Sequence, residues 1–290
     1  MQQCALGYAH GQCYGTLFLR YFENNLRIEG AMSLSPFWDL FFGAALITKA
    51  LWYFYERPTN HGVSKLRQLS FYLGMFLAFI LLVGPIAHLA ITKFWLHMVQ
   101  HVGLMMLISP LIVLGSPIKV LVNSRDLRVK KIIVGIGRNI LVRQLFRPEV
   151  GFLIFLTILI LTHFSPLADA GMINPNIHEF ELILFLVGGF IYYYPVMSGN
   201  PQPFTVPYAA RVLSLFAMML PETMTGFFLY SGNKLLHDVP MKMSDMNGIA
   251  DQHRGGAIMW AMGMLIDAIW ISMAAYEWIA NEKRIADAND

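Results

Sequence analysis

The chain has 290 residues, of which 56% are hydrophobic and 13% are charged, and its formal net charge is +3. Soluble domains carry about a quarter charged residues, so this composition excludes an ordinary soluble protein and indicates a polytopic membrane protein. Helices are the default structure for crossing lipid, because each helix satisfies its own backbone hydrogen bonds.

Seven apolar runs are long enough to cross a bilayer, which takes about 20 helical residues. In chain order they lie at about 37–55, 69–90, 95–116, 150–165, 179–197, 208–230 and 256–279. We therefore expect an all-α polytopic membrane protein, in which residues 32–290 form one bundle of seven transmembrane helices.

The first 31 residues form an N-terminal tail that contains Cys4, His10 and Cys13. The tail lacks the basic start, apolar core and cleavage site of a signal peptide. It is either an external metal-binding segment or an extension upstream of a start at Met32, and the second reading is favoured because the first apolar run follows Met32 directly. No functional prediction is drawn from its cysteines.

Lys and Arg residues predict the orientation of the bundle, because short cytoplasmic loops collect them. The most basic loop lies between the third and fourth runs, and its cations are Lys119, Arg125, Arg128, Lys130, Lys131, Arg138, Arg143 and Arg147. The loop between the fourth and fifth runs has no Lys or Arg. We therefore expect the N-terminus outside and the C-terminus inside the cell.

Part of this basic loop, residues 124–147, mixes cations with apolar residues at roughly helical spacing. This pattern predicts an amphipathic helix that lies on the anionic inner leaflet, with membrane lipid as its partner. Because the orientation rule already accounts for the charge, we expect no nucleic-acid partner.

Histidines concentrate at the predicted outer face. Seven of the nine lie there: His88, His97, His101, His163, His178, His237 and His253. His97 and His101 are four positions apart, so both rings can reach one ion from one helix face, and neutral imidazole suits Cu, Zn, Fe and Ni. His163 and His178 flank one short loop. These four are the predicted metal ligands and His88 is a weaker candidate; the alternative is ordinary interfacial polarity.

The loop before the last run holds Met241, Met243 and Met246 between His237 and His253. Thioether sulfur is a soft ligand that favours Cu(I), so this loop is a candidate for copper capture. Contact with a partner protein, or plain packing, is an equally good explanation for its methionines.

Three acidic residues, Glu181, Glu222 and Asp267, lie inside apolar runs. Charges within a membrane are costly and usually face the bundle interior or a polar cavity. Glu181 lies about one turn after His178, and we expect it to orient a ligand imidazole.

Several stretches of the sequence together resemble the CtaG family of cytochrome c oxidase assembly factors. They are "HMVQH" followed by "SPLIVLGSP", then "THFSPLAD", "IHEFELILFLVGGFIYYYP" and "DQHRGGAIMW", in matching order over about residues 36–280. Asp251, Gly255 and Gly256 belong to the last motif and have no assigned role. Leu182 stands where this family often has a second histidine, so Glu181 or His88 would have to take that place.

The resemblance implies an assembly factor for a caa-type oxidase in the bacterial inner membrane, which helps copper reach the catalytic subunit. It favours His97 and His101 as the core of a copper site, with His163 and His178 as companions. The resulting hypothesis is a membrane copper chaperone without enzymatic activity, which binds Cu(I) at its outer face. Its expected partners are the oxidase catalytic subunit and a copper donor protein.

Two alternatives remain open at this stage. A haem-binding electron-transfer protein would take one axial histidine from each of two facing helices. A copper permease would need polar residues along a path, and only Glu222 and Asp267 continue inward.

Overall fold

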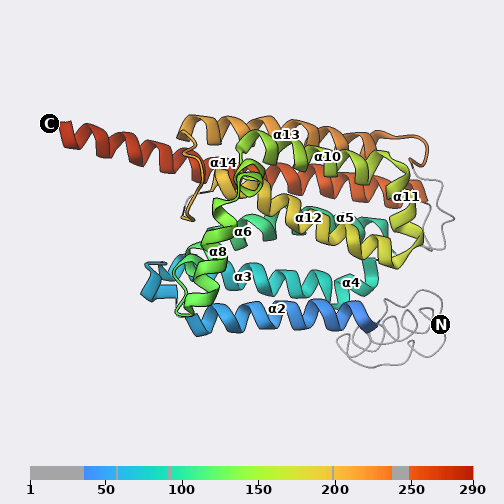
Figure 1. Ribbon diagram of the computed structural model, residues 1–290. Helices are drawn as coiled ribbons and strands as arrows, with labels where there is room; N and C mark the ends of the chain where they lie inside the picture. Colours follow the sequence, from blue (N-terminus) through green and yellow to red (C-terminus); the bar gives the residue numbers. More distant parts are fainter. Residues whose placement is uncertain (1–35, 57, 91–92, 198, 237–247, 290) are drawn as a thin grey trace, which may run out of the picture.

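The computed structural model describes residues 36–56, 58–90, 93–197, 199–236 and 248–289, and within them every regular element is a helix (Figure 1). In chain order these are α2 (Pro36–Glu56), η2 (Pro58–His61), α3 (Lys65–Leu82), α4 (Pro85–Ala90), α5 (Phe94–Val102), η3 (Gly103–Ile108), α6 (Ser109–Leu114), α7 (Pro117–Val122), α8 (Leu127–Arg138), α9 (Ile140–Leu145), α10 (Pro148–Phe164), α11 (Pro166–Ile173), α12 (Pro175–Val196), α13 (Tyr208–Ser231) and α14 (Gly248–Asn289). The all-α prediction is confirmed for this part of the chain.

The predicted apolar runs all fall on helices. Among the described residues, five segments are long and apolar enough to cross a membrane, namely α3, α5 to α7, α12, α13 and α14. The pair α10 and α11, bent by 67°, brings the number to six if the two helices form one span. The first predicted run forms α2, a helix of 21 residues that is not among these segments. Its Asp39, Lys49 and Trp and Tyr residues lower its mean hydropathy. Seven spans therefore stay a prediction.

The long helices run side by side, and the two ends of the bundle differ (Figure 1). At one end lie α4, α11 and the first turns of α5, α12 and α14; we call this the histidine end. At the opposite end lie α7, α8 and α9. Helix α8 has no buried residue, and its Leu127 and Ile132 side chains are exposed, as an amphipathic surface helix requires.

The helix that starts with α5 widens in its middle into a π-helix, η3. Such segments are rare and occur frequently at functional sites. The widened backbone leaves carbonyl groups that accept side-chain hydrogen bonds, from Ser109 Oγ to Leu104 O and from Trp270 Nε1 to Met106 O, both at 2.8 Å. Helix α12 packs closely here, because a Cβ atom at Gly189 would lie 2.5 Å from Met105 O.

Candidate metal centre

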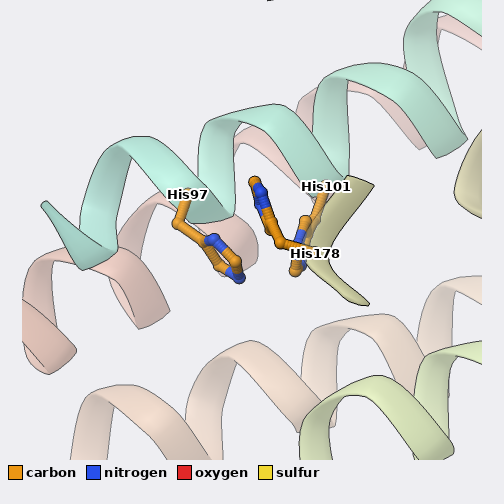
Figure 2. Close-up of side chains that lie close together, drawn as sticks. All are labelled: His97, His101 and His178. Carbon is orange, nitrogen blue, oxygen red and sulfur yellow. The ribbon is translucent and has the colours of Figure 1, made fainter. Parts of the chain in front are cut away.

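Three histidine rings from two helices meet near the histidine end of the bundle (Figure 2). His97 and His101 come from α5 and His178 from the start of α12, and all three are buried. One ligand nitrogen from each ring lies within 4.8 Å of the other two. Two nitrogens that bind one ion at about 2.0 Å each are at most about 4 Å apart, so small side-chain rotations would close this triad around an ion.

The local structure explains why His178 reaches the triad. Asn174 precedes α12 and its side chain accepts a hydrogen bond from the backbone N–H of Asn176 at 2.9 Å. Pro175 occupies the first helical position, where its missing N–H costs nothing. This start places His178 in the first turn of α12, level with the first turns of α5.

Ring nitrogens of the triad are available to bind a metal ion. Both ring nitrogens of His101 and Nε2 of His178 are buried and have no hydrogen-bond partner within the described residues. A buried polar atom without a partner costs about 1–3 kcal/mol, and a coordinated ion would satisfy one nitrogen of each ring. The donors are neutral nitrogens, and they fit a metal that imidazole prefers.

His163 lies beside the triad but outside this group of three. Its ring centroid is 5.6 Å from that of His101. Its Nδ1 lies 2.9 Å from Leu159 O and 3.0 Å from Thr162 Oγ1, and Thr162 Oγ1 already donates to Ile158 O. Nδ1 therefore carries the proton in this arrangement, and Nε2 carries the lone pair that a metal would use.

Two other predicted ligands lie apart from the triad. His88 on α4 is partly exposed and its Nε2 lies 3.8 Å from Asp39 Oδ2 on α2. His253 on α14 places its Nε2 2.8 Å from Gly232 O. The remaining candidates lie outside the described residues, namely His237, Met241, Met243 and Met246, and so does the N-terminal tail.

The three intramembrane acids are all buried. Glu181 packs against α11, because a Cβ atom at Gly171 would overlap its carboxylate; its predicted part in orienting His178 stays a prediction. Glu222 on α13 and Asp267 on α14 interact electrostatically with each other. The sequence offered no partner for Asp267, and the packing of α13 on α14 supplies one.

The last motif of the sequence holds α5, the helix of His97 and His101, against α14. Asp251 Oδ2 accepts a hydrogen bond at 2.9 Å from the backbone N–H of Phe94, the first residue of α5. A Cβ atom at Gly255 would lie 2.7 Å from the Phe94 ring, and one at Gly256 would lie 2.4 Å from the backbone nitrogen of Tyr230. The motif therefore joins α14 to both α5 and α13, a role that spacing alone did not reveal.

We expect Asp251→Ala to lower the free energy of unfolding by about 1–3 kcal/mol, because the buried Phe94 N–H loses its hydrogen-bond acceptor. The decrease should be visible as a lower midpoint of thermal unfolding in detergent. Asp251→Asn, which keeps an acceptor for the Phe94 N–H, should lower the midpoint clearly less. Equal midpoints for Asp251→Ala and the unmodified protein would contradict this role.

Comparison with known proteins identifies one family. The family model described as cytochrome c oxidase caa3 assembly factor matches residues 48–281. This range contains the triad, His163 and the motif at Asp251.

Relatives of this chain occur in mycobacteria. Uncharacterised proteins of Mycobacterium bovis and Mycobacterium tuberculosis are each 28% identical to it over 208 residues, and one of Mycobacterium leprae is 27% identical over the same length. Each match covers 68% of this chain and 32% of the relative, so the chain spans about a third of the length of these curated relatives. No solved structure matches the chain.

Proposed function

The chain belongs to the family of cytochrome c oxidase caa3 assembly factors, and from this premise we propose that it binds Cu(I) at His97, His101 and His178 and assists copper-centre formation in the catalytic subunit of the oxidase. The observation that carries the proposal is the convergence of three buried imidazoles, whose ligand nitrogens lie within 4.8 Å of one another. The role is that of a carrier, so it requires ligands and no catalytic group.

The charge of the donor set favours a monovalent ion. Three neutral imidazoles leave the full charge of the metal inside an apolar bundle, and the cost of a buried charge rises steeply with its size. Cu(I) brings one positive charge, whereas Zn²⁺ or Cu²⁺ brings two. Imidazole is a good ligand for copper, so the triad suits Cu(I) better than a divalent ion.

The position of the triad favours exchange with a partner. His97 and His178 lie in the first turns of their helices, near the histidine end of the bundle. In the proposed orientation this end faces the outside of a bacterial inner membrane, and α8 and α9 lie on the inner surface with their cations against anionic lipid. The ion would then be handed to the oxidase at the outer face, after receipt from a copper donor.

Metal analysis and a visible spectrum of detergent-purified protein test the proposal. We expect at least one Cu(I) per chain after loading under reducing conditions, without colour, because Cu(I) has a filled d shell. A Soret band would instead identify a haem protein. The cavity between His101 and His163 measures about 10 Å³, far below the several hundred Å³ of a cofactor pocket, so no Soret band is expected. Failure to retain any copper would contradict the proposal.

A further inference from the structure

A second group of side chains that can bind a metal lines a small cavity, which lies deeper in the bundle than the triad. The cavity measures about 10 Å³ and lies next to the triad, with His101 in its wall. Its other residues with donor atoms are Met105, Met106, His163, Glu222 and Met259, and the rest of its lining is apolar. A space of this size has room for one water-sized atom, such as an ion or a single water.

The methionines reach the cavity from two sides. Met105 and Met106 belong to the π-helix η3, and Met259 comes from α14. All three are buried, with at most 3% of each side chain exposed. Met106 extends toward α14, because a Cβ atom at Gly263 would lie 3.9 Å from its Sδ. The widened turn of η3 thus places two consecutive thioethers at the level of one cavity.

Glu222 is the feature that packing alone does not explain. It is 2% exposed, and its side chain interacts with a second buried acid, Asp267 on α14. An acidic side chain in this position is costly unless a partner satisfies it. A cation in the adjoining cavity would balance the charge of this pair of acids, and the pair would balance the charge of the cation.

We propose that this cavity is a second Cu(I) position, ligated by His163 and by thioethers of Met105, Met106 and Met259, with Glu222 as its counter-charge. The identity of the ion rests on the proposed function. Thioether and imidazole are the ligand types that Cu(I) takes, whereas Mg²⁺ and Ca²⁺ require a shell of oxygens. The two positions share a wall at His101, so an ion held by the triad can move inward without leaving the bundle.

A chelator-buffered Cu(I) titration of the purified full chain tests the second position. The unmodified protein should bind two equivalents, and Met105→Leu/Met106→Leu/Met259→Leu should bind one. Leucine keeps the volume of methionine closely, so the core should stay packed. X-ray absorption should show a sulfur shell that grows between the first and second equivalents and is missing from this variant.

The control is Met224→Leu/Met262→Leu/Met264→Leu, which changes three methionines that are 38–44% exposed and should leave both equivalents bound. One equivalent in both the unmodified protein and the first variant would overturn the second position and leave the proposed function standing. Loss of both equivalents from a stably folded first variant would also overturn an independent second position. No bound copper in any of these proteins would overturn both proposals.

Discussion

Replacing His97 and His101 together by alanine is expected to lower the Cu(I) affinity of the triad by more than ~100-fold. The double variant leaves His178 as the only ligand, and loss of even an outer partner of a ligand typically costs 10–100-fold in affinity. Both side chains are buried in the triad. The affinity is measured by competition with a Cu(I) chelator, using purified protein.

His253→Ala is the matched control for this prediction. His253 is another histidine near the same end of the bundle, but its Nε2 lies 2.8 Å from Gly232 O and it stands outside the triad. Its loss should leave the affinity of the triad within about twofold. An unchanged affinity in the double variant would place the copper elsewhere. A His178→Ala variant that bound like the unmodified protein would remove α12 from the site.

Gly256→Ala is expected to have a large effect on stability, lowering the free energy of unfolding by about 1–3 kcal/mol or more. A Cβ atom at this position would lie 2.4 Å from Tyr230 N and 2.8 Å from Gly226 O. Both contacts are to backbone, so α13 and α14 would have to move apart. The thermal unfolding midpoint in detergent measures the loss.

Gly263→Ala, on the same helix, separates this clash from helix propensity. A Cβ atom at Gly263 meets only the end of Met106, at 3.6 Å or more, which is ordinary contact. Alanine is favoured over glycine inside a helix by about 1 kcal/mol. Gly263→Ala should therefore leave the stability unchanged or raise it. If Gly256→Ala were as stable as the unmodified protein, the helices would tolerate separation and the prediction would be wrong.

Much of the fold follows from the length of the apolar runs. Long apolar runs specify helices, and all seven runs fall on helical segments. The breaks were harder to predict. The run at 69–90 is divided between α3 and α4, and the run at 95–116 contains the π-helix η3. A π-turn adds one residue within an apolar stretch, so no change in composition marks it.

The candidate site was predictable where its residues share one helix. The spacing of His97 and His101 places both on one face of α5, whereas the choice of a third histidine depends on how helices rotate and pack. The structure brings His178 into the group and leaves His163 just outside it. His88 is drawn toward Asp39 on α2, an arrangement that no local pattern specifies.

The residues that support the site were the least visible in the sequence. Asp251 and Phe94 are 157 positions apart, so their hydrogen bond could not be read from local spacing. Met105, Met106 and Met259 lie in apolar runs, where methionine normally fills a core. Only their common cavity with Glu222 distinguishes them from packing residues.

The copper-to-haem ratio of the caa-type oxidase, purified from cells that make either the unmodified protein or His97→Ala/His101→Ala at equal levels, tests the central claim most directly. If the triad supplies copper, the oxidase from the variant cells should contain its haem but clearly less copper, and His253→Ala cells should yield the normal ratio. A normal copper-to-haem ratio with the double variant, at limiting copper in the medium, would contradict the account.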